Sequence, residues 1–197
     1  MTRIIGVSGK SCSGKNYFVE LLNKETEWPA VDVDVIGHDV IDQAASEVAS
    51  VFGNEVILPD GKVNRKAVGR IVFSDSRKLE KLERIVHPRM VKKVRSVAEN
   101  CRSSVLIVNA AILHRMRLDR ICDLIVYVKA PFKTRLFRAM KRDGCTKDAF
   151  LKRCRSQRDI SSRNFCKGKQ VVVVDSGGSI HQIHRQIKRI CGIICTE

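Results

Sequence analysis

The sequence predicts an α/β fold built on a parallel sheet. Short apolar, β-branched runs alternate with segments of helical spacing, and a glycine-rich loop connects the first run to the first helical segment. Strands that alternate with helices are typical of a parallel sheet whose faces are covered by helices. The 197 residues suffice for one compact domain, so we expect a single domain over residues 1–197.

Four apolar runs are predicted to be buried strands because they are short and rich in β-branched residues. They are Arg3–Val7, Ser104–Val108, Leu124–Val128 and Gln170–Val174. A fifth strand is expected to end within Val31-Asp32-Val33-Asp34. Helical spacing predicts helices over Tyr17–Lys24, Arg77–Glu99 and Lys133–Arg142.

Two regions interrupt the alternation of strands and helices. Residues of about 36–100 are mostly helical, with a turn at Pro59-Asp60-Gly61 and a break expected at His87-Pro88. This stretch is longer than a simple crossover requires, so we interpret it as an inserted helical subdomain. Residues of about 135–169 are crowded with arginine and lysine. By itself that density is also compatible with a solvated helical face.

The glycine-rich loop Gly9-Lys10-Ser11-Cys12-Ser13-Gly14-Lys15 has the pattern of a phosphate-binding loop. It follows a predicted strand and precedes a predicted helix, so its backbone N–H groups can surround the phosphates of ATP. Glycines allow the tight path, and the Lys15 ammonium is suited to the outer phosphates. The sequence therefore predicts a kinase that uses ATP and Mg²⁺. Asn16 stands where a hydroxyl residue normally ligates the metal, so we expect Mg²⁺ to be held there weakly or through water.

Two carboxylates follow the predicted second strand. Carboxyl ends of neighbouring parallel strands share one crevice, so a carboxylate there would lie near the phosphates and serve as a base for an acceptor hydroxyl. Alternation predicts Asp32 and Asp34 on one side of an extended segment, with His38 one helical turn later. In the simpler interpretation one aspartate caps the next helix and the other is solvated.

Arginines at helical spacing predict a cationic stripe on the helix near residue 140. Arg135, Arg138 and Arg142 would line one face, followed by Arg153 and Arg158 after the turn at Asp143-Gly144. Arginine stabilises the charge that spreads over a migrating phosphoryl group. Contact with nucleic acid is the competing interpretation, but aromatic residues make up only 5% of the chain and form no base-stacking pattern.

The overall composition limits the partners and the compartment. A formal net charge of +16 favours anionic partners without identifying them. The eight cysteines have no spacing typical of a zinc site, and we expect reduced thiols. The sequence has no pattern of a secretory signal and no apolar run of the ~20 residues that a membrane span needs. We therefore expect a cytoplasmic protein with no membrane association.

These motifs, in this order, resemble the dephospho-coenzyme A kinase family over almost the whole chain. The resemblance includes Ile5-Gly6-Val7-Ser8-Gly9 with the phosphate-binding loop, and Val33-Asp34-Val35-Ile36-Gly37-His38. It continues through Phe52-Gly53, Asp60-Gly61-Lys62-Val63-Asn64-Arg65-Lys66-Ala67, Ile71-Val72-Phe73 and Ile85-Val86-His87-Pro88. Pro131, Arg138, Arg142-Asp143, Arg153, Gln157 and Asp175-Ser176-Gly177 complete it. Each motif is weak alone, and their joint order is specific.

The resemblance implies a three-layer α/β/α kinase fold with a helical acceptor-binding insertion and a lid over residues of about 135–169. It implies ATP and dephospho-coenzyme A as substrates, with Asp34 as the general base. His38, Arg65, His87 and Pro88 would surround the acceptor, and Lys15, Arg138 and Arg142 would contact the transferred phosphate. The residues expected to bind ATP are Gly9, Ser11, Cys12, Ser13, Gly14, Lys15, Asn16, Tyr17, Arg138, Arg142, Asp175, Ser176 and Gly177.

The sequence departs from the family pattern at three places. Asn16 replaces a hydroxyl residue, and Ser176 replaces the commoner asparagine beside the adenine. Asn109-Ala110-Ala111-Ile112-Leu113-His114 stands where many members have Pro-Leu-Leu, an aromatic or aliphatic residue, and Glu. Three alternatives to a dephospho-coenzyme A kinase therefore stay open: another nucleoside or nucleotide kinase of this fold, a basic nucleic-acid-binding ATPase, and a non-catalytic nucleotide sensor. The sequence does not define the oligomeric state.

Overall fold

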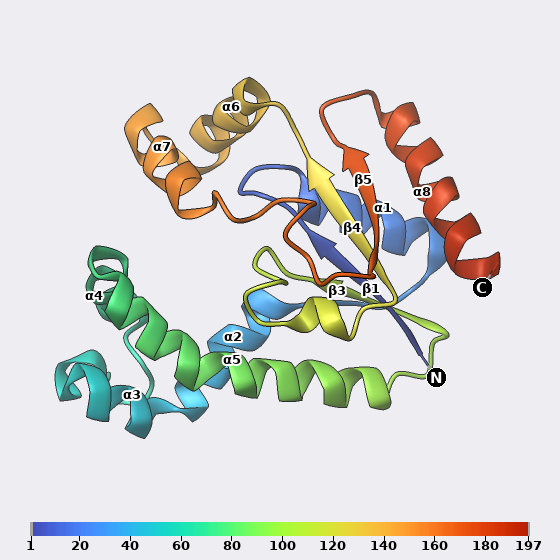
Figure 1. Ribbon diagram of the computed structural model, residues 1–197. Coiled ribbons are helices and arrows are strands. Elements are labelled where there is room, and N and C mark those ends of the chain that lie inside the picture. The colour runs from blue at the N-terminus through green and yellow to red at the C-terminus, as the bar shows by residue number, and fades with distance from the viewer. Residues whose placement is uncertain (1, 197) are drawn as a thin grey trace. The chain divides into compact units, whose positions relative to one another are not determined.

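The computed structural model describes residues 2–196, which contain five strands and eight α-helices in a three-layer α/β arrangement (Figure 1). The residues form two compact units. One unit joins the first 31 residues to the segment that begins at Ala98, and the other is Asp32–Val97.

The sheet consists of five parallel strands in the order β2-β3-β1-β4-β5. The strands are β1 (Arg3–Ser8), β2 (Ala30–Asp32), β3 (Val105–Asn109), β4 (Leu124–Lys129) and β5 (Gln170–Asp175). Register pairs Val7 of β1 with Asn109 of β3 and with Val126 of β4. The sheet predicted from apolar runs is confirmed, and the ends of the four predicted runs differ from those of the strands by at most one residue.

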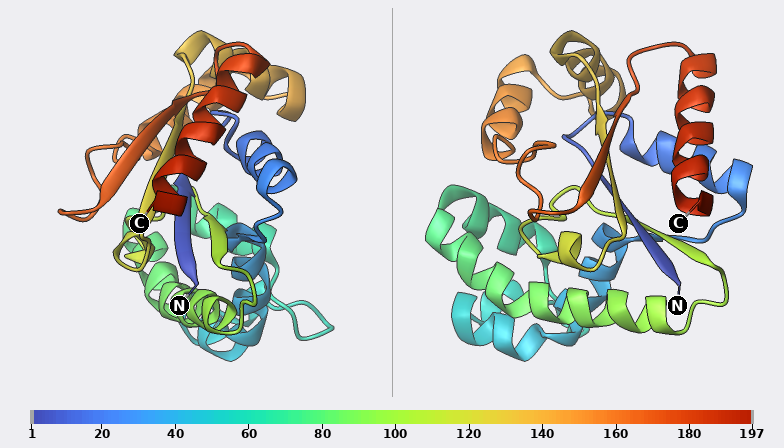
Figure 2. Two further views of the ribbon diagram at one scale, coloured as in Figure 1. Left: turned by 90° about the vertical axis from the view of Figure 1, so that its right-hand side faces the viewer. Right: turned by 45° about the vertical axis from the view of Figure 1, so that its right-hand side comes forward.

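Helices α1 (Lys15–Thr26) and α8 (Ile180–Thr196) cover one face of the sheet (Figure 2). Phe18 and Leu22 of α1 and Ile187 of α8 are fully buried against the strands. A full burial of such side chains contributes about 1.5 to 3 kcal/mol each. Packing on the central strand β1 thereby fixes the start of α1, and with it the loop between them.

The opposite face of the sheet is covered, within the first unit, by irregular segments on either side of β4. Leu113 and Leu118 come from the connection after β3, which includes a short 3₁₀ turn at Leu118–Arg120, and Ile160 comes from the connection before β5. The hydroxyl of Tyr127 on β4 donates to the carbonyl of Ile160 over 3.1 Å. These contacts hold the two connections close to the carboxyl half of the sheet.

Helices α6 (Phe132–Asp143) and α7 (Lys147–Ser156) follow β4. Gly144 ends α6 in the left-handed conformation, with φ of 59°, and the Thr146 hydroxyl caps α7 by accepting from the Ala149 amide over 3.2 Å. This turn was predicted at Asp143-Gly144. It lets the two arginine-rich helices pack on one another.

The second unit consists of α2 (Val33–Gln43), α3 (Ala45–Phe52), a short 3₁₀ turn at Asn54–Val56, α4 (Arg65–Ser74) and most of α5 (Ser76–Glu99). A tight turn lies at the predicted Pro59-Asp60-Gly61, where the Gly61 amide donates to the Leu58 carbonyl over 2.9 Å. Val48 and Val56 are fully buried in this unit.

The break predicted at His87-Pro88 is wrong, because α5 continues through Pro88. A proline inside a helix removes one backbone hydrogen bond and usually kinks or ends the helix. Here Val86, Met90 and Val94 recur every four residues and are buried on one stripe that spans both sides of the proline. The packing of that stripe offsets the lost hydrogen bond.

All eight cysteines are free thiols, as the sequence analysis predicts. In residues 2–196, no helix combines the length and the apolar character that crossing a membrane requires.

Candidate active site

The loop between β1 and α1 follows a path that only glycine permits at two positions. A Cβ on Gly9 would lie 2.4 Å from the backbone oxygen of Val128, and Gly14 has φ of 84°. The Ser13 amide donates to the Lys10 carbonyl over 3.0 Å, which closes the loop on itself. The loop ends at the amino terminus of α1. The first backbone N–H groups of a helix have no partner within the helix, and they attract anions.

Lys15 opens α1 and is buried within a network of side-chain amides. Its Nζ donates to Oδ1 of Asn109 and, over 3.2 Å, to Oδ1 of Asn16. Nδ2 of Asn109 donates to the same Asn16 oxygen over 3.3 Å. The sequence analysis gave Asn109 no role, although its signal was present: it directly follows a predicted strand that neighbours the loop-bearing strand.

The arginines of α6 all contact the backbone or side chains of the loop. Arg135 donates to the Ser11 carbonyl over 3.5 Å, and Arg138 donates to the Cys12 carbonyl over 3.4 Å. Nη2 of Arg142 lies 3.8 Å from the Cys12 sulfur. The predicted stripe thus lies over the phosphate-binding loop, within one compact unit. Arg135 is buried and packs over the Phe150 ring at 5.5 Å, so it holds α6 to α7.

Asp143 holds two of the arginines in place. Its carboxylate accepts from Nε of Arg142 over 2.7 Å and from Nη1 of Arg153 over 2.8 Å. The hydrogen bond from Arg142, followed by that from Arg153, keeps the pKa of the Asp143 carboxyl well below its ordinary range. Arg153 also donates to the Ser11 hydroxyl over 3.2 Å, and Gln157 accepts from the Ser11 amide over 2.8 Å.

The connection from β5 to α8 closes the other side of the loop. The buried hydroxyl of Ser176 donates to the Ser13 carbonyl, and Arg138 donates to both the hydroxyl and the carbonyl of Ser176. Gly177 donates its amide to the Asp175 carboxylate over 2.8 Å. A pocket of about 670 Å³ begins here and is lined by Pro131, Asp175, Gly177, Gly178, Gln182, Arg185, Gln186 and Arg189.

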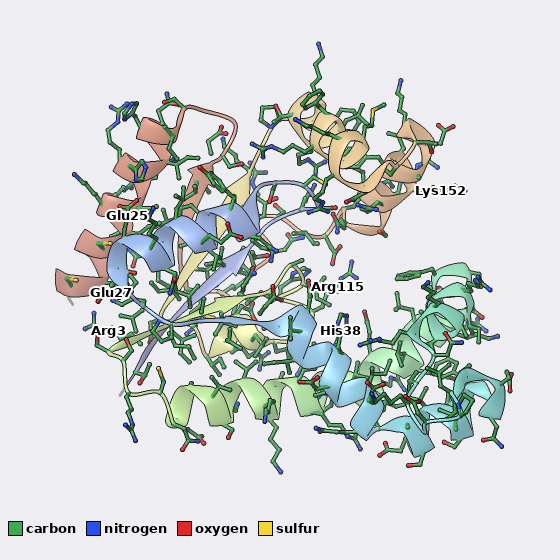
Figure 3. All side chains as sticks on the ribbon, turned by 180° about the vertical axis from the view of Figure 1, so that it is seen from behind. Arg3, Glu25, Glu27, His38, Arg115 and Lys152 are labelled. Atoms are coloured by element: carbon green, nitrogen blue, oxygen red, sulfur yellow. The ribbon has the colours of Figure 1, made fainter. Side chains whose placement is uncertain are left out.

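The carboxylates of the predicted base lie in the second unit, and their local structure differs from the prediction. Asp32 ends β2 and caps α2, because its Oδ1 accepts from the Asp34 amide over 2.9 Å. Asp34 therefore belongs to the first helical turn and does not alternate with Asp32 on an extended segment. His38 follows one turn later on α2 and, like Asp34, is exposed (Figure 3).

The remaining predicted acceptor residues also belong to the second unit. Arg65 is the first residue of α4, which Asn64 caps by accepting from the Ala67 amide over 3.1 Å. His87 and Pro88 lie in α5. On the donor side, Tyr17 on α1 is about half exposed, at 49%. The first unit thus gathers the predicted ATP-binding residues, and the second contains every predicted acceptor residue.

One charged cluster near the site was not predicted. The Asp159 carboxylate accepts from Nε and Nη2 of Arg115, each over 2.6 Å, and lies 2.8 Å from Nε2 of His114. The hydrogen bonds from Arg115 hold the pKa of Asp159 well below its ordinary range, and the contact with His114 lowers it further. This cluster ties the connection after β3 to the end of the arginine-rich segment. Its partners are 44 and 45 residues apart, so sequence spacing gives no signal for them.

Comparison with known proteins gives one consistent family. A family model described as dephospho-CoA kinase matches residues 3–189. The dephospho-CoA kinase of Arabidopsis thaliana is 31% identical over 199 residues, which cover 95% of this chain and 82% of that protein. The enzyme of the same name from Fusobacterium nucleatum is 29% identical over 193 residues, with coverage of 97% and 98%.

Solved structures agree with the fold. A crystal structure from Thermus thermophilus superposes with a TM-score of 0.82 at 25% identity and covers 98% of this chain and 97% of its own. Dephospho-CoA kinase from Campylobacter jejuni gives a TM-score of 0.68 at 21% identity, with 98% of each chain covered. At that identity the second likeness supports the fold alone.

Proposed function

Because the chain belongs to the dephospho-CoA kinase family, we propose that it transfers the γ-phosphate of ATP to the ribose 3′-hydroxyl of dephospho-coenzyme A. This reaction is the last step of coenzyme A biosynthesis. The observation that carries the proposal is the phosphate-binding loop, with Lys15 behind it and the Arg138 and Arg142 side chains against it.

On the donor side, the loop amides and Lys15 hold the outer phosphates of ATP. Arg138 and Arg142 stand at the loop, where they neutralise charge on the phosphoryl group as it moves. Arg142 is bound to the Asp143 carboxylate, so a nucleotide phosphate would compete with that carboxylate for the guanidinium. The α6–α7 segment acts as a lid that also excludes water and limits wasteful hydrolysis.

On the acceptor side, Asp34 is the general base that takes the proton of the 3′-hydroxyl. Its position in the first turn of α2 supports this role, since the helix amino terminus favours the ionised carboxylate. Its exposure leaves the carboxylate accessible to a substrate hydroxyl. The acceptor is surrounded by four residues of the same unit: His38 on the same helix, Arg65, His87 and Pro88.

Mg²⁺ would accompany ATP in this proposal and would supply charge neutralisation at the phosphates. The residues at the loop fit a weakly held ion: Asn16 and Asn109 present amide oxygens, which are hard but neutral ligands. In residues 2–196, no group of three or more His, Cys, Asp or Glu could hold a metal by itself. Asn16 and Asn109 would then hold the ion together with the phosphates of ATP.

We further propose that the protein works in the cytoplasm on small molecules and not on nucleic acid. Eight unpaired thiols support a reducing compartment. The basic residues of α6 contact the phosphate-binding loop, which gives part of the charge a role in nucleotide binding.

The test is a coupled ADP-release assay with ATP and three acceptors: dephospho-coenzyme A, adenosine and AMP. We expect turnover with dephospho-coenzyme A. With adenosine and AMP we expect less than about a hundredth of that rate, because these truncated acceptors lack the groups whose binding energy promotes the reaction. A Lys15→Ala variant measured in parallel reports contaminating activity. Turnover with adenosine or AMP, and none with dephospho-coenzyme A, would overturn the acceptor assignment.

A further inference from the structure

We propose that a small pocket beside the phosphate-binding loop is a separate binding site for a small oxyanion such as inorganic phosphate. The pocket has a volume of about 180 Å³ and lies between the loop, the end of β4 and the start of α6. Its lining consists of Lys10, Ser13, Tyr127, Val128, Lys129, Ala130, Phe132 and Arg135. The inference goes beyond the proposed function, because the proposed mechanism gives the side chains of Lys10, Ser13 and Arg135 no step.

Arg135 brings a buried positive charge to this pocket. The residue is only 7% exposed, and its guanidinium donates to the Ser11 carbonyl over 3.5 Å and to the Cys154 sulfur over 3.3 Å. Both acceptors are neutral, and within residues 2–196 the guanidinium forms no ion pair with a carboxylate. A buried charge is costly unless it is paired, and a guanidinium has five N–H donors. An anion in the pocket would therefore provide the partner that Arg135 lacks.

The Ser13 hydroxyl is a second buried group without a partner at this pocket. The residue is 1% exposed, and its Oγ makes no hydrogen bond within residues 2–196. It lies on the β4 side of the loop, because a Cβ placed on Gly9 would come within 2.7 Å of this oxygen and 2.4 Å of the Val128 oxygen. A buried hydroxyl without a partner costs free energy, and a hydroxyl can donate to an anion. Ser13 and Arg135 thus call for one ligand with several acceptor oxygens.

The charges and the size of the pocket define the class of ligand. Lys10 is half-buried and forms no ion pair within the described residues, whereas the exposed Lys129 lies 3.8 Å from the Asp175 carboxylate and is partly neutralised. Of the described residues that line the pocket, none is acidic. The volume exceeds what one water needs but falls below the roughly 300–1,000 Å³ of sites for drug-sized ligands. These properties favour a small multivalent oxyanion over a whole nucleotide.

The pocket is distinct from the place proposed for the nucleotide. Its lining contains neither Lys15, which is proposed to hold the outer phosphates, nor Arg138 or Arg142. It also shares no residue with the pocket of about 670 Å³ that begins at the connection from β5 to α8. The oxyanion and the nucleotide can therefore bind at the same time.

The test adds sodium phosphate at constant ionic strength to the ¹⁵N-labelled full chain and follows it by nuclear magnetic resonance. One titration contains no nucleotide, and the other contains saturating ADP. We expect the Nε–H signal of Arg135 and the backbone amide signal of Lys10 to shift along one saturable curve, with a Kd below about 5 mM in both titrations. Sodium sulfate should shift the same signals, because sulfate is also a tetrahedral oxyanion, and sodium chloride should not.

Variants separate this pocket from the general positive charge of the protein. Lys10→Gln and Ser13→Ala should each raise the Kd for phosphate at least about fivefold, because each removes a donor to the anion. Lys133→Gln removes an exposed lysine of α6 outside the pocket and should change the Kd by less than about twofold. If the buried Ser13→Ala substitution impairs folding, the comparison of Lys10→Gln with Lys133→Gln decides alone.

Three results would overturn the proposal. The first is the absence of a saturable shift in the wild type, which would mean that the pocket holds water only. The second is equal affinity for phosphate in the wild type and Lys10→Gln. The third is a shift that ADP alone reproduces and that phosphate no longer causes once ADP is bound, which would assign the pocket to a nucleotide phosphate. A failure of the chain to bind ADP would contradict the proposed function, and the titration without nucleotide would still decide on this site.

Discussion

Arg138 and Ser176 are joined by two hydrogen bonds, from Nη1 to the serine hydroxyl over 3.1 Å and from Nη2 to its carbonyl over 2.8 Å. Nη1 of the same guanidinium also donates to the Cys12 carbonyl. One side chain of α6 therefore connects the phosphate-binding loop to the connection before α8. The planar guanidinium presents two nitrogens to these acceptors at once, whereas a lysine side chain has only one.

Replacing Arg138 should impair phosphoryl transfer more than it impairs folding. We expect Arg138→Ala to lower kcat by about 10- to 10³-fold, because it removes a cation from the developing phosphoryl charge. Arg138→Lys should recover part of the rate through its charge. Arg155→Ala, an exposed arginine on α7, is the matched control and should change kcat by less than about twofold. Equal losses in Arg138→Ala and Arg155→Ala would mean that only the general positive field matters.

Gly9 should tolerate no side chain. The Cβ of an alanine there would lie 2.4 Å from the Val128 backbone oxygen and 2.7 Å from the Ser13 hydroxyl, so the loop must move. We expect Gly9→Ala to lower the free energy of unfolding by about 1 to 3 kcal/mol and to weaken ADP binding. Gly192→Ala in α8 meets no atom within 4 Å and should raise stability by up to about 1 kcal/mol. Urea unfolding of both variants would check this, and unchanged ADP binding by Gly9→Ala would contradict it.

The Asp159 cluster should stabilise the fold in a pH-dependent way. Because Arg115 lowers the folded-state pKa of Asp159, the stabilisation is complete above the unfolded pKa of about 4 and is lost as pH falls toward the folded pKa. Because the Asp159 side chain is 39% exposed and solvent screens its ion pair, we expect Asp159→Asn to lower the free energy of unfolding by only about 0.5 to 1 kcal/mol at pH 7, and by less at pH 3. Asp39→Asn, which removes an exposed carboxylate of the other unit, is the control for the loss of one negative charge. A difference that grows below pH 4 would contradict the sign.

The sheet and the main helices could be predicted because burial dictates their sequence patterns. Strands buried on both faces appear as continuous apolar runs, as in Leu124–Val128, and long helices show stripes such as Val86, Met90 and Val94. The same stripe explains the error at Pro88. Local propensity predicts a break there, and packing over several turns outweighs it.

The site was only partly predictable, for reasons of distance along the chain. Loop residues up to Lys15 have a local pattern that backbone geometry imposes, so sequence suffices for them. Asn109 contacts Lys15 across 94 residues, and Asp159 contacts Arg115 across 44, so only the fold reveals these partners. The Asp32 cap on α2 is a local feature, but the alternating pattern of Val31 to Val35 is equally compatible with a strand. The hydrogen bond from the Asp34 amide to the Asp32 side chain stabilises the helix start instead.

The role of Asp34 as base gives the sharpest prediction about catalysis. Asp34→Asn keeps the size of the side chain but removes the proton acceptor, so turnover should fall by about 10² to 10⁴-fold. The proposed role of Asp34 is to accept a proton and not to bind the nucleotide, so ADP affinity measured by calorimetry should change little. Asp39→Asn makes the same change five residues further along α2 and should leave turnover near wild type. Near-normal turnover in Asp34→Asn would remove this carboxylate from the role of base, whereas a parallel loss of ADP binding would indicate that the substitution disturbs the nucleotide site.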